Sequence, residues 1–522
     1  MAEHWQQHLA SINTGLAVGA LAVATLAFFF LRKSPQSGKP LSELPGPTPS
    51  FLLGNARNFP LDDWLGVFTR WKEEYGEIKS LGVLQPEPNS EQFVVGDIIH
   101  MYLPGTNVLV LNSFEDAEEL FVKRAQIWSG RNNNRMVNEY IGFGWSIIQI
   151  QPSHAFYEQR KAFRKVIGPH VVAQYNTLIE QEADNLVRRL SGFSGDIEPI
   201  IQEATGAVII KLAYGDKVFR EHGPELVDLN VKCVDMITWS LVQLWVVNIF
   251  PISRFLPSWF PGLKYPSFAK ENGAMISKLR NWAYDLVKAD VDKGSADFSV
   301  ISKYLNEPEL TGQYLKDSTA LMYMGGVDTT GSALLALFAN LLTHPEVQKR
   351  IHEELDTVVS PGHLPTANDI PSLEYLKATW DESLRHCPPI PTGVPHVNTE
   401  DDFWKGYHVP KGTMVITNVG YMLRDKRLWG EDADEFKPER FLPQYNPRAK
   451  ELPNVESMAF GFGRRICPGR HIAELNGLLF AAAILCAYEI LPMEGETNVK
   501  IEYTTNQIRR PHNLKCRFVS RQ

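Results

Sequence analysis

Hydrophobic residues recur with helical spacing through most of the chain after about residue 151. The helical pattern is clearest in four stretches, at 175–190, 209–212, 226–247 and 274–291. Alternating apolar residues predict short strands at 108–111, at 414–418 and within the last twenty residues, and Ser113 is placed to cap a helix over 113–123. Many helices with a small strand-rich portion predict an α+β fold that is mainly α.

A separate apolar segment precedes these elements. Residues 15–31 form an uncharged run of 17 residues, at the short end of the roughly 17 to 25 that span a bilayer. Arg32 and Lys33 follow directly, whereas residues 1–14 contain no lysine or arginine. The positive-inside rule then predicts a transmembrane anchor with residues 1–14 in the lumen and the bulk of the chain in the cytosol. A cleaved signal peptide is the alternative, but such peptides carry their basic residues before the apolar run.

Residues 32–55 form a basic and Pro-rich hinge that contains Leu44-Pro45-Gly46-Pro47. Prolines lack a backbone donor and favour a stiff, extended connector. No Gly/Ser linker, repeat or low-complexity tract divides residues 56–522, so we expect one large domain there. Residues 75–96 contain a stretch that we interpret as a loop insertion without an assigned function; a gene-model artefact is the alternative.

The composition narrows the function classes. The 522 residues are 44% hydrophobic and 21% charged, which is enough for a large core. The net charge of -8 and the absence of a basic groove with aromatic residues argue against nucleic acid. None of the five cysteines has Cys-x-x-Cys spacing, so neither a disulfide scaffold nor a zinc site is indicated, and a reducing compartment fits.

One cysteine lies in a motif that suits a metal-binding thiolate, Phe460-Gly461-Phe462-Gly463-Arg464-Arg465-Ile466-Cys467-Pro468-Gly469. Such a ligand needs backbone N–H donors and shielding from water. Gly463 and Gly469 allow tight turns and close approach to a flat macrocycle, Phe460 can cover the sulfur, and Arg465 suits a carboxylate. The alternative is a Gly-rich turn followed by a buried free cysteine.

The order Phe-x-x-Gly-x-Arg-x-Cys-x-Gly resembles the cysteine-ligand signature of the cytochrome P-450 family at every fixed position. This resemblance implies that Cys467 is the axial ligand of haem b and that Arg465 binds a haem propionate. It also implies the fold of that family, a large helical bundle around the haem with a small β-rich portion. The Pro-Gly-Pro hinge resembles that of membrane-bound members.

A second segment, Gly325-Gly326-Val327-Asp328-Thr329-Thr330, interrupts the apolar helix predicted over 321–342. Glycine inside a helix costs about 1 kcal/mol relative to alanine, so the two glycines need a reason. A groove over a flat cofactor supplies one, and the Thr329 hydroxyl can bond a helix carbonyl and open the helix. A polar patch facing another helix is the alternative. The segment resembles the oxygen-activation motif of the family, which implies that Asp328 and Thr329 are its acid–alcohol pair.

Other residues gain a role from the same resemblance. Glu382 and Arg385 form a Glu-x-x-Arg motif, and with Arg440 they resemble the Glu–Arg–Arg cluster that supports the ligand loop. Arg160 and His396 align with propionate partners. Phe156 stands where the family usually has tryptophan, which removes an indole N–H from this contact.

Two surface features carry open alternatives. Arg160, Lys161, Arg164 and Lys165 form a basic stripe, either a solvated helix face or, with Arg464 and Arg470, a docking patch for an acidic electron donor. The aromatic, proline-broken stretch over 248–262 is either a core-forming loop or, as in membrane-bound members, a bilayer-contacting loop at the substrate entrance.

The resemblance therefore predicts a haem-thiolate monooxygenase in the endoplasmic reticulum membrane that oxidises a lipophilic terpenoid, sterol or polycyclic metabolite with O2. Electrons would come from an NADPH-dependent reductase, with cytochrome b5 as a second donor, in a role similar to fungal secondary metabolism. We expect the substrate pocket to be lined by residues 132–144, 324–329, 391–395 and 504–508. The alternatives are a haem-thiolate isomerase or dehydratase that needs no reductase and a non-catalytic, membrane-anchored haem-binding protein.

Overall fold

The computed structural model describes residues 39–51, 53–78, 96–256, 265–308, 310, 312–496 and 499–521. The predicted anchor at 15–31, residues 79–95 of the predicted insertion and residues 257–262 of the aromatic stretch lie outside the described residues. The main helices are α2 (Trp64–Ile78), α3 (Phe114–Glu118), α4 (Ala125–Trp128), α5 (His154–Ile167), α6 (Asn176–Arg189), α7 (Glu198–Tyr214), α8 (Asp216–Val242), α9 (Val246–Ile249), α10 (Tyr265–Asp292), α11 (Val300–Tyr304), α12 (Gly312–Thr343), α13 (Pro345–Val358), α14 (Glu374–His386), α15 (Val419–Met422), α16 (Lys426–Trp429), α17 (Glu456–Ala459) and α18 (Arg470–Ala487).

The strands form small sheets that lie beside the helices. The largest sheet has the order β1-β2-β7-β4, in which β2 and β7 are parallel and the other pairs are antiparallel. A second sheet has the order β3-β11-β8. The strands are β1 (Ile98–Leu103), β2 (Thr106–Leu111), β3 (Ser194–Asp196), β4 (His396–Val397), β5 (Asp402–Trp404), β6 (Tyr407–Val409), β7 (Met414–Thr417), β8 (Tyr488–Leu491), β9 (Glu502–Tyr503), β10 (Pro511–His512) and β11 (Lys515–Ser520).

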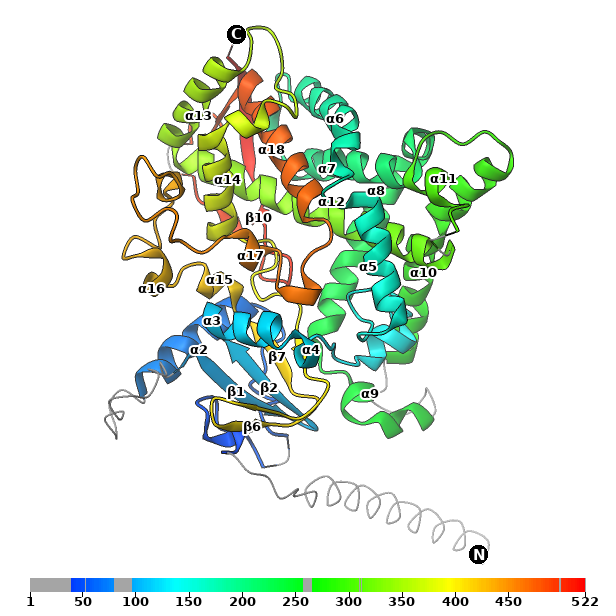
Figure 1. Ribbon diagram of the computed structural model, residues 1–522, viewed down its shortest axis with the longest axis vertical. Coiled ribbons are helices and arrows are strands. Elements are labelled where there is room, and N and C mark those ends of the chain that lie inside the picture. The colour runs from blue at the N-terminus through cyan, green and yellow to red at the C-terminus, as the bar shows by residue number, and fades with distance from the viewer. Residues whose placement is uncertain are drawn as a thin grey trace, which may run out of the picture.

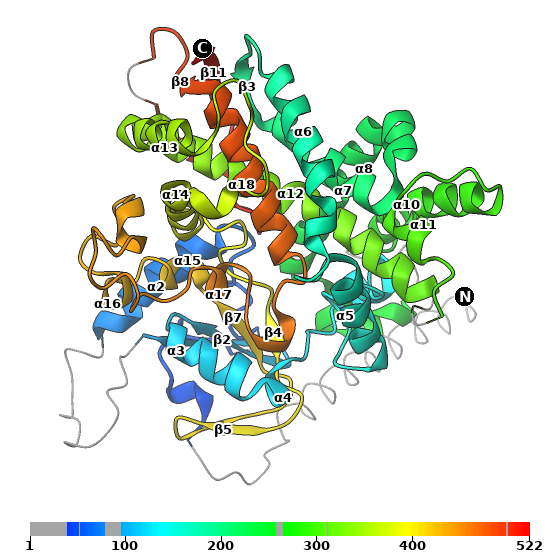
Figure 2. The same cartoon turned by 45° about the horizontal axis from the view of Figure 1, so that its top comes forward.

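Helix α12 is the centre of the helical part (Figure 1). Its apolar residues are buried on nearly all sides, and it packs against α5, α7, α8, α10, α14 and α18. A helix that is hydrophobic all round is buried in the core of a large protein. Figures 1 and 2 show β1, β2 and β7 gathered at one end of the molecule, with α6 and α13 at the other.

The predicted fold class, α+β and mainly α, is confirmed, and so are the strands at 108–111 and 414–418. The helix predicted over 226–247 ends earlier, at Val242, and a short extended segment leads to α9. Among the described residues, α18 is long and apolar enough to cross a bilayer, but 61% of it is buried inside the protein, where it packs against α6, α12 and α13.

Candidate active site

The segment between α17 and α18 holds Cys467 in a defined turn. The Cys467 backbone N–H donates to the carbonyl of Phe460 at 2.8 Å. Gly463 has φ +52°, and a Cβ there would collide with the carbonyl oxygen of Phe121, so only glycine fits. Gly469 has φ −90°, which any residue adopts, and an added Cβ would meet Cys467 Sγ at an ordinary 3.9 Å. The backbone thus requires glycine at 463 but not at 469.

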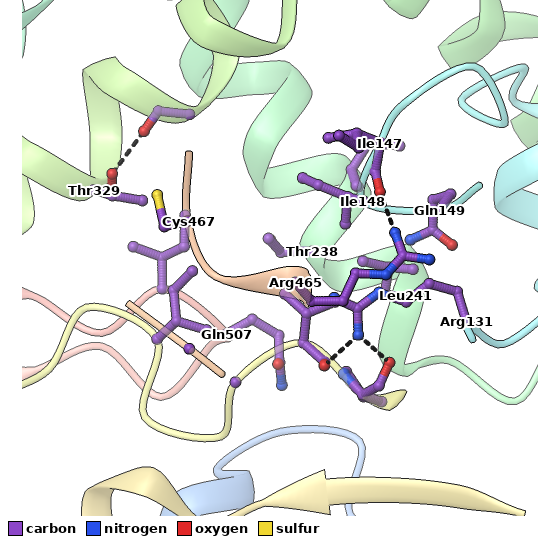
Figure 3. Close-up of a pocket in the computed structure, with 18 of the residues that line it drawn as sticks. Arg131, Ile147, Ile148, Gln149, Thr238, Leu241, Thr329, Arg465, Cys467 and Gln507 are labelled. Carbon is purple, nitrogen blue, oxygen red and sulfur yellow. Dashed lines mark hydrogen bonds between the residues drawn. The ribbon is translucent and has the colours of Figure 1, made fainter. Parts of the chain in front are cut away.

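The sulfur of Cys467 lines a large internal cavity together with Thr329 of α12 (Figure 3). Burial raises the pKa of the Cys467 thiol, and the backbone N–H of Gly469 and the cations Arg160 and Arg470 oppose that effect. A bound metal cation deprotonates a coordinating thiol outright. A single sulfur with a backbone donor and positive charge nearby is suited to bind a metal as the thiolate.

Basic side chains from three segments surround the same cavity. Arg465 donates to the carbonyls of Ser129, Ile147 and Ile150 at 2.8, 2.8 and 2.7 Å. Arg160 of α5 donates to the carbonyl of Ile466 at 2.6 Å. His396 of β4 bonds the Trp128 carbonyl through Nδ1 at 2.7 Å, so Nδ1 carries the proton. Backbone carbonyls therefore fix all three predicted propionate partners at the rim of the cavity.

Arg131 is a fourth basic residue at this rim and was not predicted from the sequence. It is buried, with Nη1 donating to the carbonyls of Val394 and Pro395 at 2.8 and 2.7 Å, while its Nε has no partner. No spacing rule distinguishes Arg131 in the sequence, because it follows Gly130 in a loop between α4 and α5. Only the fold brings it to Arg465.

The rim cations are electrostatically uncompensated. Burial and the neighbouring Arg465 lower the pKa of Arg131, and burial followed by repulsion from Arg160 lowers the pKa of Arg465 to about 9. The pKa of His396 is also lowered, first by burial and then by Arg131. Within the described part of the chain none of these arginines pairs with a carboxylate. Buried charges are normally paired, so this rim calls for a ligand with acidic groups.

Phe156 takes a different role from that of the tryptophan it replaces. Its ring is buried on α5, and the guanidinium of Arg465 lies over it at 4.1 Å from the ring centroid. A guanidinium over an aromatic face is attracted by the ring quadrupole. Phe156 thus holds Arg465 in place by stacking, without offering a hydrogen bond itself.

The glycines of α12 serve different purposes. A Cβ on Gly325 would meet nothing within 4 Å, and this residue is open to the cavity. A Cβ on Gly326 would lie 2.6 Å from Ile209 of α7, so this glycine allows the two helices to pack closely. Thr329 Oγ1 donates to the Gly325 carbonyl at 2.6 Å, as expected, but α12 is continuous from Gly312 to Thr343. The predicted opening of the helix is therefore not seen.

Asp328 is buried beside this groove with unsatisfied acceptors. Its side chain is 2% exposed, and neither carboxylate oxygen has a hydrogen-bond partner. Burial raises its pKa to about 6; Arg510 opposes this effect, and Asp235 and Glu198 add to it. A carboxyl group that titrates near neutral pH is suited to proton transfer. Asp328 and Thr329 thus place an acid and an alcohol next to each other on α12.

The cavity itself has a volume of about 500 Å³ and extends from Cys467 to the C-terminal end of α8. Each of the four segments predicted to line the pocket contributes residues to it. The α8 wall, which includes Thr238 and Leu241, and Gln149 were not predicted from the sequence (Figure 3). The described lining contains no aspartate, glutamate or lysine, and its charged residues are Arg131, Arg160 and Arg465.

Comparison with known proteins identifies this arrangement. A family model described as cytochrome P-450 matches residues 87–518. The chain belongs to the cytochrome P-450 family. It is 31% identical over 513 residues to cytochrome P-450 monooxygenase 208 of Postia placenta, covering 97% of this chain and 94% of that protein. It is 29% identical to the monooxygenase claR of Ampulloclitocybe clavipes, with 99% and 93% covered, and 29% identical to the monooxygenase eriA of Hericium erinaceus, with 96% and 92% covered.

The protein is thus a cytochrome P-450 monooxygenase, and its family implies a haem-thiolate cofactor. The residues present fit that group. Cys467 is the one cysteine that lines the described cavity, and the unpaired Arg131 Nε lies among rim cations that two haem propionates would neutralise. Gly325 adds no side-chain bulk to the cavity wall, which would leave room for a flat ring.

The Glu382 cluster of this cytochrome P-450 is fully buried. Glu382 accepts from Arg385 at 2.7 and 2.9 Å and from Arg440 at 3.0 Å. The two arginines donate further to carbonyls of the segment that leads up to Arg440, those of Leu423, Trp429, Asp432, Ala433 and Glu435. The cluster therefore ties α14 to residues 423–440, and its described hydrogen bonds do not reach the Cys467 loop itself.

Proposed function

We propose that this cytochrome P-450 oxidises an uncharged, lipophilic small molecule, such as a terpenoid, sterol or polycyclic metabolite, with O2 and electrons from an NADPH-dependent reductase. The observation that carries the proposal is the lining of the cavity. Apolar residues dominate it, and its described residues include no carboxylate that could neutralise an amine. A substrate carboxylate would compete for the rim cations that suit the propionates.

The chain's own residues divide the work of this reaction. Haem b, when bound, would supply iron that activates O2, and the Cys467 thiolate would donate electron density to it. Arg131, Arg160, Arg465 and His396 would hold the propionates. Asp328 would release and regain a proton, and the Thr329 hydroxyl would pass that proton into the cavity across Gly325.

Gln149 is the polar contact that we assign to the substrate. Its side chain is 6% exposed, lines the cavity and has no described hydrogen-bond partner. Its carboxamide faces the cavity and can exchange a hydrogen bond with a ligand hydroxyl or carbonyl, which is worth about 0.5–1.5 kcal/mol. We therefore expect a lipophilic substrate that already carries at least one oxygen function.

The electron donor would dock on the face that carries Cys467. Arg160 turns inward to Ile466, so it does not belong to the predicted basic surface. Lys161, Arg164 and Arg464 remain exposed there. A reductase with an acidic surface, or cytochrome b5, would be attracted to this patch, and the attraction would weaken with salt.

An apolar surface supports a location on the endoplasmic reticulum membrane. Phe250, Ile252, Phe255 and Leu256 follow α9 and are exposed, Phe255 at 73%. Exposed apolar clusters of this kind mark interaction with a partner or a membrane. Together with the anchor predicted at 15–31, they would hold the domain on the cytosolic side with the cavity near the lipid. The fungal monooxygenases among the relatives support a role in secondary metabolism.

A binding and turnover experiment tests the proposal. Purified full-length protein should show a substrate-induced spectral shift with oxygenated terpenoids or sterols, and weaker shifts with the parent hydrocarbon, acid and amine. Gln149→Leu should remove the preference for the alcohol over the hydrocarbon, while Thr343→Ala, on the far end of α12, should keep it. Product should form only with NADPH and a reductase. Product formed without a reductase would instead indicate an isomerase or dehydratase and refute the proposal.

A further inference from the structure

Lys377 of α14 lies at the centre of a cluster of acidic side chains. Its ammonium contacts Asp381 at 2.8 Å, Glu474 at 2.8 Å and Glu456 at 3.1 Å. Asp381 is one turn further along α14, whereas Glu456 is the first residue of α17 and Glu474 lies in the second turn of α18. One side chain thus joins three helices.

These contacts bracket the thiolate loop. Helix α17 leads directly into Phe460, whose carbonyl accepts the hydrogen bond from the Cys467 N–H. Helix α18 begins at Arg470, three residues after Cys467. Helix α14 packs against both α17 and α18. The Lys377 ammonium therefore bonds to the segment before the cysteine and to the segment after it.

The charges in the cluster make Lys377 hard to replace. Three carboxylates converge on one ammonium, and the four side chains are 20–34% exposed, so solvent screens them only in part. Burial raises the pKa of Asp381 to about 6, although Lys377 opposes that effect. Arg470 adds a weaker attraction to Glu456. Without the ammonium, like charges on α14, α17 and α18 would repel and separate the two flanks of the loop.

We propose that Lys377 is a positioning residue that clamps both flanks of the Cys467 loop to α14 and so maintains thiolate ligation of the haem. It touches neither the cavity nor Cys467 and acts through the loop. The Glu382 cluster fixes a different segment to the same helix, so the two clusters have separate tasks.

The test follows the absorption band of the reduced, carbon-monoxide-bound protein, whose red shift reports thiolate ligation. We expect Lys377→Met to lose this band about 10-fold faster than wild type in mild denaturant, because the residues of one charge network are energetically coupled. Lys377→Arg keeps the positive charge, and its thiolate band should decay at a rate within about twofold of the wild-type rate.

Lys211→Met is the matched control. Lys211 of α7 is also a partly buried lysine between two carboxylates, at 2.9 Å from Glu182 and 2.8 Å from Asp216, but it lies away from the thiolate loop. This variant should lose stability in urea without a faster loss of the thiolate band. If Lys377→Met and Lys211→Met lose the band at the same rate for the same loss of stability, Lys377 has only a structural role and the proposal is wrong.

Neutralising the carboxylates on α17 and α18 gives a second, independent test of the proposal. If repulsion opens the loop, Lys377→Met combined with Glu456→Gln and Glu474→Gln should recover most of the lifetime of the band. Should Lys377→Met fail to fold, Glu474→Gln alone, which frees one flank, should still shorten that lifetime relative to Glu203→Gln on α7. No recovery in the triple variant, or no effect of Glu474→Gln, would overturn the proposal. A wild-type protein that lacks the red-shifted band would instead reject thiolate ligation itself.

Discussion

Replacing Asp328 by asparagine should make the protein more stable and a poorer oxygenase. Both carboxylate oxygens are buried without a partner, and burial raises the pKa from its ordinary value of 3.8 to about 6. The difference corresponds to about 3 kcal/mol at about 1.4 kcal/mol per unit. The folded protein holds the proton more tightly than the unfolded chain, so the stability of the wild type falls as pH rises from 3.8 through 6. Asparagine cannot ionise and escapes this loss.

The advantage of Asp328→Asn should therefore grow with pH. The reference is the difference in the free energy of unfolding between variant and wild type well below pH 3.8, where both side chains are neutral. Relative to it, we expect the variant to gain about 3 kcal/mol at pH 8 and about half of that at pH 5. Urea unfolding followed by tryptophan fluorescence at several pH values measures the gain. Asp228→Asn is the control, since the Asp228 side chain is 61% exposed beside Lys232 and its replacement should leave the pH dependence of the wild type unchanged.

The same variant tests the role of the acid in turnover. Asp328→Asn should keep the red-shifted carbon-monoxide band, because Asp328 does not line the described cavity, but it should lower the product formed per NADPH. A stability difference that is the same at pH 5 and pH 8 would refute the raised pKa. Unchanged coupling of NADPH to product would refute the proton-transfer role even if the stability result holds.

Three further substitutions follow from individual contacts. Thr329→Ala removes the bond to the Gly325 carbonyl and should leave the carbon-monoxide spectrum intact while product per NADPH falls several-fold, whereas Thr343→Ala, which loses a similar helix bond at 3.2 Å, should change neither. Arg131→Leu removes a buried rim cation and should speed the transfer of haem to apomyoglobin about 10-fold, the size expected for the loss of a charged hydrogen bond. Arg464→Leu, at an exposed arginine, should not change that rate. Equal rates in the two variants would contradict the role of Arg131 in holding a propionate. Glu382→Gln leaves two buried guanidinium groups uncompensated and should lower the free energy of unfolding by about 3–5 kcal/mol, so that a loss below about 1 kcal/mol would exclude a central role for the cluster.

The sequence predicted those parts of the site whose interacting residues lie close together along the chain. The Cys467 loop could be predicted because its glycine and arginine lie within a few residues of the ligand, and the Asp328–Thr329 pair because glycines inside an apolar helix need a cause. Gly463 illustrates the limit of this approach. Its necessity could be predicted, but its actual neighbour, the carbonyl of Phe121, lies 342 positions earlier and is known only from the fold.

Residues whose role depends on distant partners could not be predicted. Arg131 and Gln149 lie in loops without periodicity, and nothing nearby in the sequence indicates that both line the cavity. Lys377 reads as an ordinary i, i+4 partner of Asp381 on a helix surface, a pair worth a few tenths of a kcal/mol. Its contacts to Glu456 and Glu474, 79 and 97 positions away, arise only when α17 and α18 meet α14.

The rim of the cavity shows why folding and cofactor binding are linked in this protein. Carbonyl oxygens hold Arg131, Arg160 and Arg465 around the cavity; burial and then repulsion from Arg465 lower the pKa of Arg131, and burial and then repulsion from Arg160 lower that of Arg465. The fold without its cofactor therefore bears the cost of desolvated cations that no described carboxylate neutralises. A ligand with two acidic groups removes that cost on binding and stabilises the folded state by the free energy of its association. The same arginines would thus favour a dianionic ring in the cavity, and Cys467 would bind its metal.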